Sequence, residues 1–266
     1  MPGVPIWQVD AFADRPFAGN PAAVCILDEP RDDDWLQAVA SEMNLAETAF
    51  LRSRDDGYEL RWFVPEVEVA LCGHATLASA HTLWENGFAA AEQTLRFHTQ
   101  SGLLTAERRG DFIELNFPAT PVAEAEPPAG LLAALGLAPE SVRFAGRTKF
   151  DRLLLLETAE EVRRLKPDFG LLAAIDTRGV IVTAAADDAQ YDVVSRFFGP
   201  SVGVNEDPVT GSAHCALAPF WAERLGNPTI AAYQASRRGG VVRATLQGDR
   251  VLLAGRAVTV LKGELV

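Results

Sequence analysis

The sequence has few of the residues on which disulfides and metal sites depend. Its 266 residues include three cysteines and four histidines. The three cysteines, Cys25, Cys72 and Cys215, show neither a CxxC pair nor the Cys/His spacing of zinc ligands. They predict neither a disulfide framework nor a metal site, and we expect reduced thiols.

The chain also lacks an excess of positive charge and any long apolar run. Lys and Arg number 24 against 36 Asp and Glu, which gives a net charge of -12. This balance argues against a nucleic-acid partner, because phosphate binding needs a basic surface. No apolar run is long enough to span a membrane, and the first residues lack the basic and apolar regions of a signal peptide. We expect a cytoplasmic protein without membrane contact.

Motifs of the common nucleotide-binding and hydrolytic enzymes are missing as well. We find no GxxxxGK[ST] phosphate loop, no GxGxxG after a strand, no GxSxG elbow and no HExxH pair. These absences disfavour nucleotide-dependent enzymes, serine hydrolases and zinc proteases.

The pattern of predicted elements indicates two halves with one plan. The length and the 48% hydrophobic content favour two domains. In each half, strands lead through a glycine turn into a long helix, which opens at Gly73 or Gly211 and closes at Gly87 or Gly226. Aligning the two opening glycines also aligns small residues within the helices, as duplication would produce.

The domain boundary is predicted in a stretch rich in Pro, Ala and Glu. Residues 118–130 show no periodicity and are interpreted as a linker. We predict domains at 1–118 and 119–266, with a last strand near 258–266 that can return to the first domain. In the second half, residues 160–175 are predicted as one helix.

Each glycine-opened helix is a candidate anion site. Its first backbone N–H groups lack partners within the helix, and its dipole favours negative charge. Gly73 and Gly211 would then donate to a small carboxylate, helped by Thr210 and Ser212. The alternative is that the glycines serve only tight turns and that the hydroxyls are helix caps.

Glu47 is the candidate proton-transferring residue. It lies among apolar neighbours in NLAETAFL, at the entrance of a predicted strand. Apolar surroundings disfavour a charged carboxylate and make it more basic. An exposed or capping role is the alternative, and Glu42, Glu66 and Glu68 share the ambiguity.

His74, Asp207 and Asn20 complete the candidate set. His74 follows Gly73, where an imidazole could exchange protons near neutral pH. Asp207 precedes the second helix, although an Asp before Pro is also an ordinary turn residue. Asn20, in a loop expected around Gly19, is a candidate substrate contact. A two-thiol mechanism is disfavoured, because no cysteine stands opposite Cys72 in the second half.

Five segments together resemble the PhzF-like family of phenazine biosynthesis. They cover almost the whole chain and occur in the family's order. The segments are VDAFADRPFAGNPAAVCIL, NLAETAFL, RWFVPEVEVALCGHATLASAHTL, GVNEDPVTGSAHCALAPFWAERLG and GRAVTVLKGEL.

The resemblance implies an α+β, diaminopimelate-epimerase-like fold. Two pseudo-symmetric domains would each wrap a curved mixed sheet around a central helix, with the active site between them. It places the family's catalytic Glu on Glu47, its His on His74, and its Asp and Ser on Asp207 and Ser212. It implies an isomerase without cofactor or metal, acting on a small carboxylate similar to trans-2,3-dihydro-3-hydroxyanthranilate, and by analogy a homodimer.

Two other functions stay open at this point. One is a racemase or epimerase of a small acid, which would invert one carbon without moving double bonds. The other is a non-catalytic binding or scaffold protein on the same fold. A pure scaffold would not need Glu47, His74, Asp207 and Ser212 together.

Overall fold

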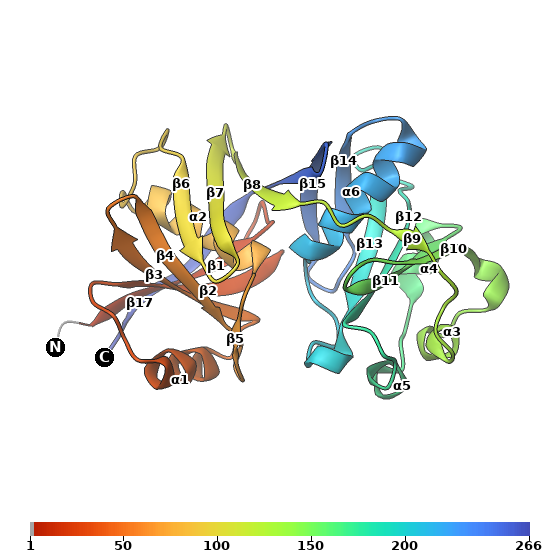
Figure 1. The fold of residues 1–266 in the computed structure, drawn as a ribbon, viewed down its shortest axis with the longest axis horizontal. Coiled ribbons are helices and arrows are strands. Elements are labelled where there is room, and N and C mark those ends of the chain that lie inside the picture. Colours follow the sequence, from red (N-terminus) through yellow and green to blue (C-terminus); the bar gives the residue numbers. More distant parts are fainter. Residues whose placement is uncertain (1–2) are drawn as a thin grey trace. The chain divides into compact units, whose positions relative to one another are not determined.

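The computed structural model describes residues 3–266, whose contacts separate into two units. The first unit runs to Phe117 and resumes with Ala254–Val266, and the second is Pro118–Leu253. Both units combine a sheet with a few helices, as the predicted α+β class requires (Figure 1). Among the described residues, no helix has the length and apolarity needed to cross a membrane.

The first unit is built on a mixed sheet with the order β17-β1-β2-β3-β4-β6-β7-β8. The pairs β2/β3 and β4/β6 are parallel and the others are antiparallel, while β5 pairs with β4. The strands are β1 (Val4–Ala11), β2 (Asn20–Leu27), β3 (Glu47–Arg54), β4 (Gly57–Phe63), β5 (Glu68–Val69), β6 (Leu95–Thr99), β7 (Gly102–Arg109), β8 (Phe112–Pro118) and β17 (Ala257–Leu265).

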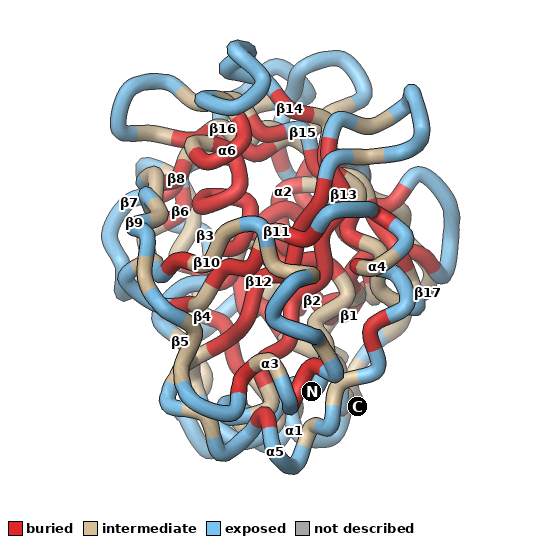
Figure 2. The backbone as a smooth tube through the Cα atoms, turned by 90° about the vertical axis from the view of Figure 1, so that its right-hand side faces the viewer, coloured by how far each residue is buried: buried red, intermediate tan, exposed pale blue. Residues whose placement is uncertain are grey.

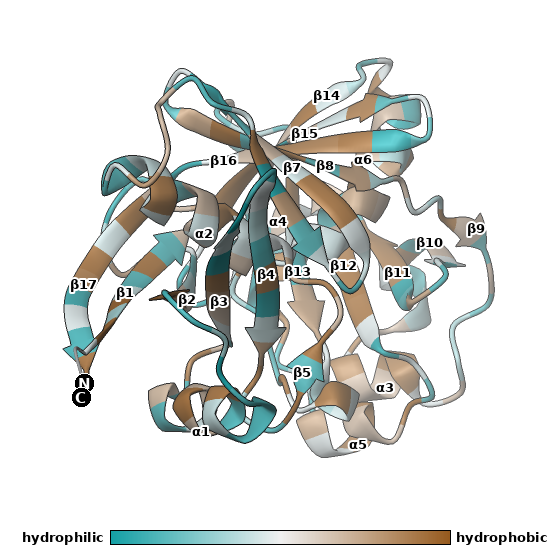
Figure 3. Cartoon of the chain, turned by 60° about the vertical axis from the view of Figure 1, so that its left-hand side comes forward, coloured by the Kyte–Doolittle hydropathy of each residue, from teal (hydrophilic) through white to brown (hydrophobic). Residues whose placement is uncertain are grey.

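The hairpin between β3 and β4 turns at Asp55, Asp56 and Gly57. Gly57 has a φ of +146°, and a Cβ there would lie 2.3 Å from the carbonyl oxygen of Arg96. Glycine is therefore required on both conformational and steric grounds. The last strand of the chain returns to β1, with Val4 opposite Leu265 (Figure 3).

Two helices cover opposite faces of this sheet. Helix α1 (Asp33–Met43) is capped by Asp32, and its C-cap Asn44 has the left-handed conformation that is common at helix ends. It packs Leu36 and Ala40 into a core cluster with Phe50. Helix α2 (Gly73–Glu85) contacts β1, β2, β3 and β17. Most of α2 is buried on all sides, because the strands of the unit surround it.

The second unit repeats the arrangement with the order β9-β10-β11-β12-β13-β14-β15. Strand β16 carries the chain toward the point where the first unit resumes. The strands are β9 (Ala123–Glu124), β10 (Val142–Arg147), β11 (Asp151–Leu156), β12 (Gly179–Ala185), β13 (Val193–Phe198), β14 (Thr229–Gln234), β15 (Gly240–Gln247) and β16 (Arg250–Gly255).

Helices again lie on both faces. Helices α3 (Leu131–Leu135), α4 (Ala159–Arg164) and α5 (Phe169–Ala173) share one apolar cluster with the sheet. Helix α6 (Gly211–Leu225) packs against β14 and β15 and is buried over most of its length (Figure 2). The indole N–H of Trp221 on α6 donates to Thr183 Oγ1 on β12 at 3.1 Å, on the opposite face from Val182.

The pairing pattern of the two units supports duplication. Along β1-β2-β3-β4-β6-β7 the pairs alternate between antiparallel and parallel. The series β10-β11-β12-β13-β14-β15 repeats that alternation pair for pair. An outer antiparallel strand is added in the same place, β17 on β1 and β9 on β10. Each unit therefore has the predicted mixed sheet with one long buried helix.

Three details of the sequence analysis were wrong. The helix predicted over 160–175 is two helices, α4 and α5, because Pro167 cannot donate an amide hydrogen and disfavours a helical residue before it. The stretch 118–130 includes β9, which pairs with β10. Asn20 is the first residue of strand β2 and fully buried, not part of a loop.

Candidate active site

In the first unit, Glu47, His74 and Asn20 come together at the start of α2. Glu47 begins β3 and pairs with Ala22 of β2. The parallel pairing places the starts of both strands at one sheet edge, where α2 also begins. His74 Nε2 lies 3.0 Å from Glu47 Oε2, and His74 Nδ1 lies 3.2 Å from Asn20 Nδ2. The chain thus places an acid/base pair at a helix start.

The Glu47 carboxylate differs from its predicted surroundings. Its side chain is 19% exposed and faces an imidazole, whereas the sequence predicted apolar neighbours or an exposed, capping role. The contact with His74 is at ion-pair distance, and Nε2 has no hydrogen bond of good geometry among the described residues. The partial exposure of the Glu47 side chain leaves its carboxylate accessible to a ligand.

A charged neighbour determines the charge of His74. Burial lowers the pKa of the imidazole, but the adjacent Glu47 carboxylate and the contact with the Cys72 sulfur outweigh this and raise the pKa of His74 above its usual value. The ring is therefore an imidazolium beside the Glu47 carboxylate at neutral pH. The Asn20 amide can serve either form, presenting its nitrogen to a neutral Nδ1 or its oxygen to a protonated one.

Cys72 caps α2 and is not a reactive thiolate. Its Sγ accepts from the amide of Ala75 at 3.4 Å and lies 3.6 Å from His74 Nδ1. Burial raises the pKa of the Cys72 thiol, and the nearby Glu47 carboxylate raises it further. The thiol stays protonated at neutral pH, as expected of a capping residue rather than a base.

Glu47, Cys72 and His74 offer the donor atoms that a metal could use. One ligand atom from each lies within 4.8 Å of the others. However, Cys72 and Glu47 approach different ring nitrogens of His74, Nδ1 and Nε2 respectively. The arrangement suits proton transfer across the ring better than one shared ion.

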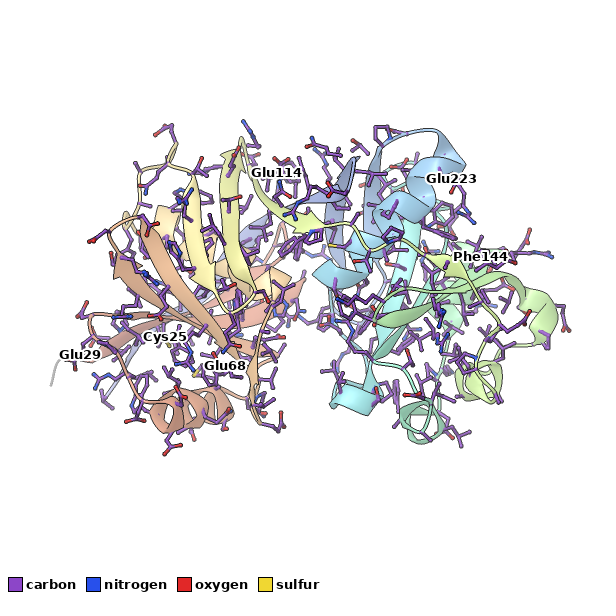
Figure 4. The ribbon with its side chains drawn as sticks, in the orientation of Figure 1. Cys25, Glu29, Glu68, Glu114, Phe144 and Glu223 are labelled. Carbon is purple, nitrogen blue, oxygen red and sulfur yellow. The ribbon has the colours of Figure 1, made fainter. Side chains whose placement is uncertain are left out.

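The other glutamates considered from the sequence have separate surroundings. Glu68, labelled in Figure 4, accepts two hydrogen bonds from the guanidinium of Arg61, both at 2.7 Å. Glu42 and Glu66 are exposed. Of these glutamates, Glu47 is the one that lies beside a histidine.

In the second unit, Asp207 and Thr210 form a bonded turn before α6. The Thr210 hydroxyl donates to Asp207 Oδ2 at 2.5 Å. Gln234, fully buried at the end of β14, donates to the Asp207 carbonyl at 2.7 Å and accepts from the Thr210 amide at 2.9 Å. Sequence analysis missed Gln234, since a glutamine that ends a strand carries no distinctive pattern.

The first turn of α6 is held by a second set of contacts. His214 Nδ1 donates to the Thr210 carbonyl at 2.8 Å, and burial lowers the pKa of His214 to about 4. The ring is therefore neutral. In α2, the Thr76 hydroxyl bonds back to the carbonyl of Cys72 in the equivalent way. Arg178 Nη2 donates to Oγ of Ser212, the residue after Gly211, at 3.0 Å. No sequence motif indicated this contact.

A solved structure of low sequence identity defines the class of the fold. The probable proline racemase from Agrobacterium radiobacter K84 superposes with a TM-score of 0.67 at 13% identity, over 99% of this chain and 93% of that one. This likeness concerns the fold alone. The architecture is therefore that of the racemase and epimerase proteins, the diaminopimelate-epimerase-like fold that was predicted.

Closer relatives define the family. The family model for phenazine biosynthesis-like proteins, PhzC-PhzF, matches residues 9–263. An uncharacterized isomerase of Halalkalibacterium halodurans is 55% identical over the full length of both chains. A PhzF family protein of Enterococcus faecalis superposes with a TM-score of 0.94 at 42% identity, over 100% of both chains. The chain belongs to the PhzC-PhzF, phenazine biosynthesis-like family, and it is an enzyme of the isomerase class.

Proposed function

We propose that the chain is a cofactor-independent isomerase in which Glu47 transfers the proton. The observation that carries this proposal is the pair at the start of α2, where Oε2 of the partly exposed Glu47 lies 3.0 Å from Nε2 of the buried His74. A carboxylate beside an imidazolium can accept a proton while the imidazolium stabilises negative charge on the substrate.

The substrate that best fits the family is a small carboxylate similar to trans-2,3-dihydro-3-hydroxyanthranilate. Glu47 accepts a proton from a ring carbon, and the electrons of that C–H bond form a new double bond. The neighbouring double bond shifts, and Glu47 returns the proton to the carbon at the far end. The product is an isomer, which then tautomerises to a ketone, so the reaction needs no oxidant or co-reactant.

The remaining candidate residues bind and polarise the substrate in this proposal. His74 stabilises the charge that develops when Glu47 takes the proton. Asp207, held in its turn by Thr210 and Gln234, and Ser212 serve the same reaction. The backbone amides of Gly73 and Gly211 donate to the carboxylate, as first-turn amides can.

One observation gives weight to a racemase or epimerase instead. Cys72 is placed at the helix start beside His74, where a thiol could act as a base. Two facts oppose this. Burial raises the pKa of Cys72, and the residue at the matching position before α6 is Thr210, whose hydroxyl is bonded to Asp207. We therefore favour proton transfer by Glu47.

The experiment that tests the proposal is proton NMR in D₂O with trans-2,3-dihydro-3-hydroxyanthranilate. It compares the wild-type protein with Glu47→Gln, which removes the base but keeps the shape of the side chain. The cytoplasmic location and the homodimer expected from the sequence stay predictions.

A further inference from the structure

Arg178 in the second unit has no role in the mechanism proposed above, although its side chain is held in a defined position. It precedes β12, and the pairing of Asp151 with Gly179 brings β11 beside it. Its Nε donates to Asp151 Oδ1 at 2.8 Å and its Nη2 to Asp151 Oδ2 at 2.5 Å. The Asp151 side chain is only 2% exposed. A buried carboxylate therefore fixes the guanidinium in a bidentate pair.

Aromatic rings hold the same guanidinium in place. Its central carbon lies 5.1 Å from the ring centre of Phe150 and 5.8 Å from that of Phe197. Gly179 leaves room for the Phe197 ring, because a Cβ at that position would lie 2.2 Å from it. The Arg178 side chain is nevertheless 36% exposed, so this fixed cation is open to small solutes.

The contact between Arg178 and Ser212 has a defined direction. Arg178 Nη2 lies 3.0 Å from Ser212 Oγ. A guanidinium can only donate hydrogen bonds, so Ser212 Oγ must accept this one. The hydroxyl hydrogen of Ser212 then points to another acceptor. Thr210 differs, because its hydroxyl hydrogen is already used on Asp207.

We infer that Arg178, held by Asp151, is a positioning residue that fixes the Ser212 hydroxyl as a donor to a carboxylate oxygen of the substrate. The inference rests on the proposed function and deepens it, since it names the residue that orients the Ser212 hydroxyl toward the substrate. A donor with fixed direction favours a carboxylate over an ammonium group, which has no lone pair to accept the bond.

The test measures binding of anthranilate, a stable aromatic acid, by the backbone amide shifts of residues 211–213. Arg178→Met should weaken binding about tenfold, the loss expected for one charge-assisted hydrogen-bonding arrangement. Arg178→Lys should restore part of it. Arg163→Met is the matched control, because Arg163 also pairs bidentately with an aspartate, Asp187, and has a side chain 37% exposed. It should bind anthranilate as the wild type does.

A double-mutant comparison separates positioning from a general loss of structure. If Arg178 acts through Ser212, then Ser212→Ala combined with Arg178→Met should bind no more weakly than Ser212→Ala alone. Thermal unfolding of each variant shows whether it is folded. The inference would be overturned if the losses of binding in the two single variants added up in the double variant. It would also be overturned if Arg178→Met bound anthranilate as the wild type does, or if anthranilate left the amide shifts of residues 211–213 unchanged in the wild type.

The D₂O assay keeps this inference separate from the proposed function. Wild-type protein that binds anthranilate through Arg178 and Ser212, but exchanges no substrate proton, would contradict the proposed reaction on trans-2,3-dihydro-3-hydroxyanthranilate and support the inference. If the wild type turns the substrate over and Arg178→Met shows an unchanged KM, the proposed function is supported and the inference is contradicted.

Discussion

His214 should make the second unit sensitive to acid over a defined range. The ring is fully buried in α6, and its Nδ1–H donates to the carbonyl of Thr210. Burial lowers the pKa of His214 from 6.5 to about 4. In the unfolded chain the ring takes up its proton near pH 6.5, whereas the folded protein does so only near pH 4. Acid therefore favours the unfolded state, and the stabilisation present above pH 6.5 is lost as the pH falls toward 4.

The magnitude follows from the size of the shift. A difference of about 2.5 pKa units at roughly 1.4 kcal/mol each corresponds to about 3 kcal/mol of unfolding free energy. The comparison protein is His214→Asn, whose side-chain amide can still donate to Thr210 but does not titrate. The raised pKa of His74 affects the unfolding free energy with the opposite sign, because its stabilising effect is lost as the pH rises. This effect cancels in the comparison, since the wild type and His214→Asn both contain His74.

Two measurements check this account of His214. Urea unfolding at several pH values between 7 and 4 should show the wild type losing about 3 kcal/mol relative to His214→Asn. The ring proton signals of the four histidines, one of them absent in the variant, should show His214 titrating near pH 4. Parallel stability curves, or titration of His214 near 6.5, would refute the reasoning.

Two further substitutions test the candidate site. Gln234→Leu removes the hydrogen-bond partner of the buried Thr210 amide and of the Asp207 carbonyl. It should lower the unfolding free energy, measured by urea unfolding, by about 2 to 4 kcal/mol. The control Gln190→Leu, at an exposed position, should change the unfolding free energy little. Cys72→Ser should keep turnover within about threefold of wild type, because the protonated thiol caps α2 and a serine can cap it too. A loss of more than about a hundredfold would indicate that the thiol is a base.

The sequence predicted the fold where local patterns agree with long-range pairing. The helix from Gly73 and the helix from Gly211 were both found, because their apolar periodicity and terminal glycines are local signals. The strand starting at Glu47 was found for the same reason. The short strand β9 was missed because it exists only through its pairing with β10, a tertiary contact that no local pattern reveals.

The sequence named candidate residues but not their contacts. Glu47 and His74 were separate candidates, each from its own segment and from the family resemblance, while their distance of 3.0 Å depends on the pairing of β3 with β2 and on the position of α2. Gln234 and Arg178 could not be found, since they act through partners distant in sequence. Their polar contacts follow from the folded arrangement of strands.

The most direct test of the central claim is the exchange of substrate protons in D₂O. The wild-type protein is mixed with trans-2,3-dihydro-3-hydroxyanthranilate, and proton NMR follows loss of substrate and entry of deuterium. Glu47→Gln should be folded but slower by about 10² to 10⁴, the usual contribution of a positioned base. Glu42→Gln, which changes an exposed glutamate of α1, should match the wild type. Unchanged turnover in Glu47→Gln would contradict proton transfer by Glu47.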